Sequence, residues 1–218
     1  MDGAVVEVAW RTVSMAALAT LVMLPPGIGL AWVLARRTFP GRALLETLVS
    51  LPLVMPPVAT GLLLIWVFGR RSPVGGLLAR LGLEVMFTWR AIVIAMAVMG
   101  LPLLVRAARA GFEHVDRRYE EIAATLGASP TRVFLTISLP LAKRSVLAGA
   151  LLGFSRALGE FGATIMVAGA LPSTRTIAVA IYSYTETGQE VAAATMLALS
   201  ASIAFGALFL SNRFAASV

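Results

Sequence analysis

Five long apolar segments constrain the fold of this chain more than any other feature of its sequence. A helix that crosses a bilayer needs about 20 predominantly apolar residues, and in lipid only helices and closed barrels satisfy all their backbone groups. We therefore expect an all-α integral membrane protein with a single transmembrane domain over residues 1–218. The five expected spans lie at about 13–35, 43–68, 91–110, 146–170 and 191–210.

The composition agrees with a membrane protein and excludes several kinds of site. Hydrophobic residues make up 59% of the chain and charged residues 13%, whereas soluble domains have about 45–50% and about 25%. The chain has no cysteine and only one histidine, His114. Disulfides, thiolate metal sites and two-histidine metal motifs are therefore excluded. We also expect no cleavable signal peptide, because the first apolar run is too long for one.

Prolines inside three of the expected spans indicate kinked helices. Such prolines are tolerated where neighbouring helices or water satisfy the backbone groups that the proline frees. The sequence therefore predicts that these helices pack in a bundle. The prolines are Pro25 and Pro26 in the first span, Pro52, Pro56 and Pro57 in the second, and Pro102 in the third.

The basic residues predict an orientation in the membrane, because cytoplasmic loops carry an excess of Lys and Arg. We expect the more basic side, which includes the C-terminus, to be cytoplasmic and the N-terminus to be outside. The opposite side holds Arg11, Arg70, Arg71, Arg80, Arg90 and Arg175. The more basic side holds Arg36, Arg37, Arg42, Arg106, Arg109, Arg117, Arg118, Arg132, Lys143, Arg144 and Arg213.

A polar segment between the third and fourth spans predicts a helix, a tight turn and a second helix. Asp116 can cap the first helix, and Gly127 can take the left-handed position that ends it. Ser129 can cap the second helix, with Pro130 at its first position. Pro140 is expected to close that helix. The segment is the expected cytoplasmic hairpin, residues 117–140.

Three interpretations of this hairpin compete. A DNA-binding helix-turn-helix has similar spacing, but its recognition helix should present polar and basic side chains to the bases. Here Arg132 is followed by an apolar run, so we expect no nucleic-acid partner. An interfacial connector would explain the apolar second helix, but it leaves the pair Glu120 and Glu121 and the firm turn unexplained. A short amphipathic helix that docks in a groove of a soluble partner accounts for both.

The spacing of the hairpin resembles the EAA motif, E-A-A-x3-G-x9-I-x-L-P, of ABC importer permeases. Glu121, Ala123, Gly127 and the closing I-x-L-P match, and Ile122 replaces the second motif residue while keeping the apolar character. The resemblance implies a type I importer (MetI-like) permease fold and a coupling helix that sits in a cleft of an ATP-binding subunit. The implied coupling residues are Glu120, Glu121, Ile122, Ala123, Leu126, Gly127, Ala128 and Ser129.

Four further stretches resemble the molybdate permease subunits of this class: "LVSLPLVMPPVATG", "FGRRSPVG", "FSRALGEFGATIMVAG" and "STRTIAVAIY". The resemblance implies a homodimer in a bacterial or archaeal inner membrane, two ATP-binding subunits, and a periplasmic or lipid-anchored oxyanion-binding protein. It implies import of molybdate or tungstate by alternating access. A sulfate or thiosulfate permease is the alternative within the class, and an ATP-independent anion channel is the alternative outside it.

The chain itself is not expected to be an enzyme or to hold a cofactor. A P-loop needs glycines followed by Gly-Lys-Ser/Thr to wrap phosphates, and the one lysine, Lys143, lacks such a loop. ATP and magnesium are therefore expected on the partner subunit.

Two charges lie inside the fourth expected span. Arg156 and Glu160 are four residues apart and share a helix face. Charges at membrane depth by default face the bundle interior or an aqueous cavity. Two interpretations stay open: a structural ion pair near the cytoplasmic end, or the lining of a gate. The other pathway candidates are the small or hydroxyl-bearing residues Thr60, Gly61, Gly159 and Gly162.

Overall fold

The computed structural model describes residues 2–215, and all regular structure in that range is helical. The prediction of an all-α fold is thereby confirmed. The helices are α1 Asp2–Arg36, α2 Arg42–Val54, α3 Pro57–Phe68, α4 Pro73–Arg80, α5 Trp89–His114, α6 Arg117–Thr125, α7 Pro130–Val133, the π-helical turn η1 Phe134–Ser138, α8 Leu139–Leu158, α9 Gly162–Ala168, α10 Ile177–Glu186 and α11 Glu190–Ala215.

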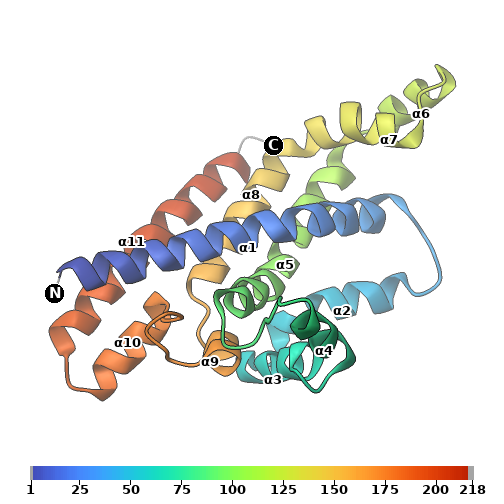
Figure 1. The fold of residues 1–218 in the computed structure, drawn as a ribbon. Coiled ribbons are helices and arrows are strands. Elements are labelled where there is room, and N and C mark those ends of the chain that lie inside the picture. Colours follow the sequence, from blue (N-terminus) through green and yellow to red (C-terminus); the bar gives the residue numbers. More distant parts are fainter. Residues whose placement is uncertain (1, 216–218) are drawn as a thin grey trace.

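Helix α5 lies at the centre of the bundle and packs against α1 and α8 (Figure 1). Small residues bring α5 and α8 close together, as is common where helices meet in membranes. A Cβ on Gly100 would lie 2.8 Å from the carbonyl oxygen of Gly153, and one on Gly149 would lie 3.0 Å from that of Leu104. The two helices therefore pack backbone to backbone.

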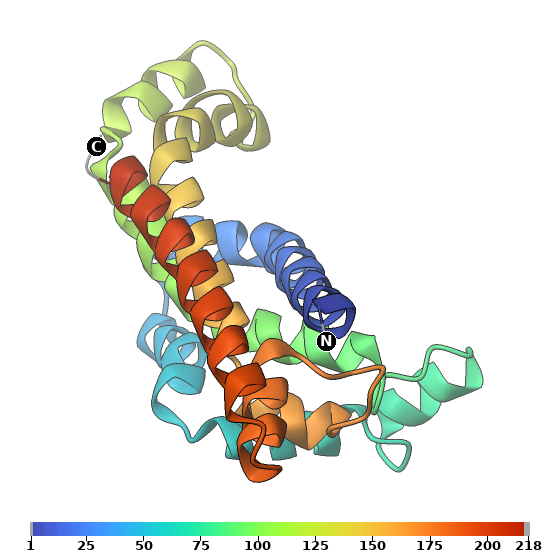
Figure 2. The same ribbon diagram turned by 90° about the vertical axis from the view of Figure 1, so that its left-hand side faces the viewer.

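The molecule has two distinct ends. Helices α6 and α7 project at one end, and α3, α4, α9 and α10 gather at the other (Figures 1 and 2). Arg36, the last residue of α1, donates a hydrogen bond to the carboxylate of Glu120 in α6. Val8, near the start of α1, packs against α10 and α11. Helix α1 thus runs from the α10 end to the hairpin end.

The second expected span is broken rather than straight. The chain bends by 117° between α2 and α3, at Met55 and Pro56. Both residues are extended, with φ −67° and ψ 144° at Met55 and φ −54° and ψ 131° at Pro56. The cause is the Pro56-Pro57 pair, because a proline removes a helical donor and disfavours helical backbone in the residue before it. The kink expected in the span over 43–68 is therefore a full break between two helices.

The fourth expected span is shifted along the sequence. The continuous apolar helix is Pro130–Leu158, formed by α7, η1 and α8, and the chain breaks before α9 rather than continuing to residue 170. Pro140 does not close the second hairpin helix, which corrects the prediction. The wider π-helical turn precedes it, with Leu139 N–H bonded to Phe134 O, and the helix continues through Pro140 into α8.

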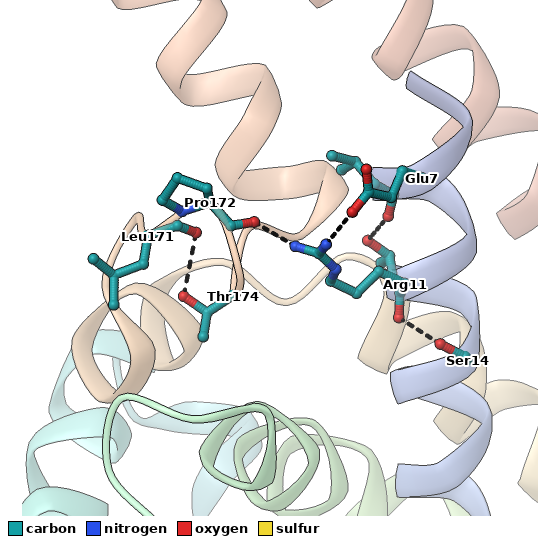
Figure 3. A network of polar contacts seen from close by, with 8 residues as sticks. Glu7, Arg11, Ser14, Leu171, Pro172 and Thr174 are labelled. Atoms are coloured by element: carbon teal, nitrogen blue, oxygen red, sulfur yellow. Dashed lines mark hydrogen bonds and ion pairs between the residues drawn. The ribbon is translucent and has the colours of Figure 1, made fainter. Parts of the chain in front are cut away.

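The loop between α9 and α10 is fastened to the start of α1. Figure 3 shows the Arg11 guanidinium between the Glu7 carboxylate, at 2.5 Å, and the carbonyl oxygen of Pro172. One turn of the same helix contributes Thr12, whose hydroxyl accepts the N–H of Ile177 at 2.9 Å. These contacts connect residues far apart in sequence and hold the end of the molecule opposite the hairpin.

Candidate functional site

The two helix caps and the glycine turn that the sequence predicts are present in the hairpin. The carboxylate of Asp116 accepts Arg118 N–H at 3.0 Å, and the hydroxyl of Ser129 accepts Arg132 N–H at 3.4 Å. Gly127 has φ +84°, in the left-handed region where a side chain is unfavourable. The 3.0 Å bonds that follow, from Gly127 N–H to Ala124 O and from Ala128 N–H to Ala123 O, form a Schellman motif.

One face of α6 is apolar and open. Tyr119, Ile122 and Leu126 are 57%, 59% and 82% exposed, and their spacing of three and four residues puts them in one stripe. The carboxylate of Glu121 is exposed as well, on the next face of the helix, and has no ion-pair partner within the part of the chain that the structure describes. We call Tyr119, Glu121, Ile122 and Leu126 the outer face of the hairpin. An apolar stripe with one free acid is suited to a groove on a partner.

Glu120 faces the opposite way. Its carboxylate accepts a hydrogen bond from Arg36 Nε at 3.1 Å and from the Ser138 hydroxyl at 2.7 Å. Arg36 also donates to the carbonyl oxygen of Val115 at 2.8 Å, and its side chain is only 7% exposed. Glu120, which the resemblance assigns to the coupling contact, joins α6 to α1 and to the start of α8; its part in coupling stays a prediction.

The other hairpin residues lie between these two positions. Ala123 and Ala128 are half-buried, whereas Gly127 and Ser129 are exposed. Behind them, the Phe134 ring packs edge-on against Trp32, with ring centres 5.5 Å apart. The hairpin is therefore a rigid extension of α1 and α8. The partner contacts of these residues stay a prediction.

Arg156 and Glu160 form the ion pair that their spacing suggests, at 2.8 Å. Glu160 is 1% exposed and also accepts Ala163 N–H at 2.7 Å. Arg156 lies at the end of α8 remote from the hairpin, about 27 Å along the helix from Ser138 at 1.5 Å per residue. The pair was expected near the cytoplasmic end, and if the hairpin is cytoplasmic, as the basic residues predict, the pair lies at the opposite end. Glu160 stabilises the break between α8 and α9.

Three of the other pathway candidates come together where α3 meets α9. A Cβ on Gly61 would lie 2.7 Å from Met166 Cβ and 3.1 Å from Ala163 Cα, and one on Gly162 would lie 2.8 Å from Pro57 Cβ. Thr60 precedes Gly61 and is buried. Gly159 is not part of this contact, since a Cβ there would meet nothing within 4 Å. We call the α3–α9 packing around Gly61 and Gly162 the broken-helix contact.

A groove between α2 and α5, with a cluster of charged side chains beside it, was missed in the sequence. Arg109 pairs with Glu46 at 2.5 Å and with Glu113 at 2.7 Å, and Arg106 approaches the Ser50 hydroxyl at 3.4 Å. The groove has a volume of ≈ 530 Å³. Both arginines lie inside the expected span over 91–110, but they were counted only with the basic residues of the more basic side. The spacing of four residues between Arg109 and Glu113 on one helix was the signal that could have found this cluster.

A cavity of ≈ 900 Å³ opens at the end opposite the hairpin, between α3, α4 and the start of α5. Arg70, Arg71 and Phe87 are among its lining residues. Arg70 is paired with Glu84, and the hydrogen bond and the charge of that carboxylate raise the pKa of Arg70 above its ordinary value. Phe87 has φ +59°, and its N–H bonds Val167 O at 2.8 Å, which ties the cavity to α9.

The fold and the hairpin together define a class: the membrane-embedded permease of an ABC importer. In fold, the chain matches the MetNI methionine ABC transporter in an inward-facing form, with a TM-score of 0.71 over 100% of this chain and 97% of the other, at 16% identity. It also matches a bacterial alginate ABC transporter, solved with its alginate-bound periplasmic protein, with a TM-score of 0.70 over 95% of this chain and 77% of the other, at 17% identity.

The chain belongs to the family of inner membrane components of binding-protein-dependent transport systems, whose pattern matches residues 27–216. It is 45% identical to the molybdenum transport system permease protein ModB of Escherichia coli K12, over 93% of this chain and 92% of that protein. It is 46% identical to ModB of Haemophilus influenzae, over 81% and 78%. It is 35% identical to the sulfate transport system permease protein CysT of Salmonella typhimurium, over 86% and 70%. The chain is a multi-pass protein of the inner membrane.

Proposed function

We propose that the chain is the permease subunit of an ATP-driven importer of molybdate, with tungstate as the second oxyanion that it carries. The observation that carries the proposal is the rigid hairpin with its open apolar face, in a chain that is 45% identical to a molybdenum permease over 93% of its length. A hairpin of this kind is suited to transmit movement from a soluble subunit to the spans.

The proposed orientation puts the hairpin in the cytoplasm. The expected cytoplasmic side, which includes the hairpin, holds most of the basic residues, and the positive-inside rule assigns such a side to the cytoplasm. The N-terminus is then outside and the C-terminus inside. The second copy of the chain would cover α2, which has no buried residue in the single chain and exposes Leu44 and Val54 by 64% and 83%.

The outer face of the hairpin is proposed to dock on an ATP-binding subunit, one for each copy of the permease. ATP and magnesium bind that subunit, and this chain holds neither. A periplasmic or lipid-anchored binding protein delivers the oxyanion at the opposite end. Closure of the ATP-binding subunits moves the hairpins together and switches the spans from inward- to outward-facing, and hydrolysis resets them.

A sulfate permease is the second candidate, supported by the 35% identity to a sulfate permease over 86% of the chain. Sulfate and molybdate are both tetrahedral dianions, so the spans can offer similar contacts to either one. An ATP-independent channel is less well supported, because a channel does not need a docking hairpin.

The test is uptake of labelled molybdate into cells that lack their own high-affinity system. The permease is supplied with the ATP-binding subunit and binding protein encoded beside it, and unlabelled tungstate or sulfate is added as competitor. We expect ATP-dependent uptake that tungstate blocks and sulfate does not. Block by sulfate alone would assign the chain to sulfate transport. Uptake that persists without the ATP-binding subunit would contradict the coupling role of the hairpin.

A further inference from the structure

Two buried hydroxyl groups, those of Thr60 and Thr164, have no hydrogen-bond partner among the described residues. The residues are 4% and 0% exposed. Buried hydroxyls in helices usually donate to the carbonyl four residues before, and Thr12 and Thr20 do so in this chain, both at 2.8 Å. The two unpartnered threonines are therefore exceptions that call for an explanation.

Their positions in the helices give one reason for the missing bonds. Thr60 is in the first turn of α3, and the carbonyl four residues earlier, Pro56 O, already accepts the backbone N–H groups of Ala59 and Thr60, at 2.9 and 3.2 Å. Thr164 is in the first turn of α9, directly after the break at Glu160. Each hydroxyl is thus carried by the second half of a broken helix.

Both threonines adjoin the broken-helix contact. Thr60 neighbours Gly61 and Thr164 neighbours Ala163, and Gly61 would place a Cβ 3.1 Å from the Cα and from the carbonyl oxygen of Ala163. The contact is therefore between backbones, and it closes the bundle where α3 and α9 meet. Broken helices in membrane proteins frequently line the route of a transported ion.

We propose that Thr60 and Thr164 are hydrogen-bond donors to the oxyanion as it passes the broken-helix contact, and that this contact separates when the passage opens. The inference rests on the proposed function and deepens it. A tetrahedral dianion such as molybdate carries only acceptor oxygens, so its route must supply donors. Two neutral hydroxyls supply them without a full positive charge that would trap the ion.

The nearby charges agree with a weak site. The ion pair at the break, Arg156 with Glu160 at 2.8 Å, is neutral as a pair and therefore adds no net charge beside the contact. Stability alone also favours an apolar side chain of the same shape at either threonine, because an unsatisfied buried hydroxyl is costly. The two hydroxyls therefore have a use outside the closed state.

The experiment replaces each threonine by valine, in Thr60→Val and Thr164→Val. The variants are purified as the full importer with its ATP-binding subunit and binding protein, in detergent for thermal unfolding and in proteoliposomes for transport. We expect unfolding temperatures equal to or above wild type. We expect the transport rate per folded importer to fall on the order of tenfold, the usual loss when a donor to a charged acceptor is removed. Thr60→Ser and Thr164→Ser keep the donor and should restore transport.

Thr12→Val is the matched control. Thr12 is equally buried, but its hydroxyl donates to Val8 O and accepts Ile177 N–H, so its valine variant should unfold at a lower temperature and transport normally per folded importer. The proposal is overturned if the Thr60 and Thr164 variants transport like wild type, or if they lose stability as Thr12→Val does. Wild-type importer that moves neither molybdate nor sulfate would instead refute the proposed function. If wild type moves sulfate, the same comparison is made with sulfate.

Discussion

At the scale of single residues, the most consequential pair is Arg156 and Glu160. Their burial is unequal, because the side chain of Glu160 is 1% exposed and that of Arg156 is 27% exposed. A charge left alone in a buried site is far more costly than the loss of the pair as a whole. Removal of Arg156, which leaves the buried carboxylate unpaired, should therefore cost more stability than removal of the Glu160 charge.

We predict that Arg156→Met destabilises the permease by about 3 kcal/mol, the low end of the range for breaking a buried pair, and that Glu160→Gln costs clearly less. Glutamine still accepts Ala163 N–H, and Arg156 can reach water. The double variant Arg156→Met/Glu160→Gln should be more stable than Arg156→Met alone. Unfolding midpoints of the purified permease measure all three. Losses that simply add in the double variant would reject the pairing.

At the scale of elements, the hairpin has two faces with different tasks. Glu120 joins α6 to α1 and to the start of α8 through Arg36 and Ser138, whereas Glu121 is exposed to solvent. We therefore predict different roles for these adjacent glutamates. Glu120 holds the hairpin to the spans, and Glu121 is predicted to contact the proposed ATP-binding subunit.

We predict that Glu121→Lys leaves the isolated permease as stable as wild type but uncouples ATP hydrolysis from transport. Glu120→Gln should instead raise amide hydrogen exchange in residues 117–140 of the isolated permease, because a hydrogen bond to a charged acceptor is lost. Mass-resolved exchange and ATPase assays separate the two effects.

Glu186→Lys supplies the control for these variants. Glu186 is exposed at the end of α10, at the other end of the molecule, so the same charge change there should not alter association with the ATP-binding subunit. Equal exchange in the Glu120 variant and wild type would show that the Arg36 contact does not hold the hairpin.

At the scale of the whole molecule, the two ends differ in what they expose. One end presents the hairpin, and the other presents α4 and the cavity of ≈ 900 Å³. The orientation that we propose assigns the hairpin end to the cytoplasm. The absence of cysteine from the sequence makes this orientation directly measurable, because an introduced cysteine has no competitor.

We predict that a membrane-impermeant maleimide labels Leu81→Cys in intact spheroplasts and labels Leu126→Cys only in inside-out vesicles. Both side chains are well exposed, by 64% and 82%, so accessibility in the single chain does not limit either reaction. The permease is produced without the ATP-binding subunit, which would cover Leu126. The reverse pattern would invert the orientation and remove the hairpin from the cytoplasmic partner.

The sequence by itself determined the helical class, the number of apolar segments and the local geometry of the hairpin. These features depend on short-range chemistry: apolar length, the caps Asp116 and Ser129, and the left-handed Gly127. The resemblance to ABC permeases could be recognised for the same reason, since its motif lies within one local unit.

Only the tertiary structure decided how far the second span bends, that the fourth span breaks after Leu158, and which polar groups meet. The prolines predicted a kink in the second span but not its angle, and hydropathy did not register the break after Leu158 because apolar residues continue on both sides of it. The direction of Glu120, the ion pair of Arg109 with Glu46 and the unpartnered hydroxyls of Thr60 and Thr164 depend on side chains from helices far apart in sequence. Burial and partners are properties of the packed bundle, and no local pattern encodes them.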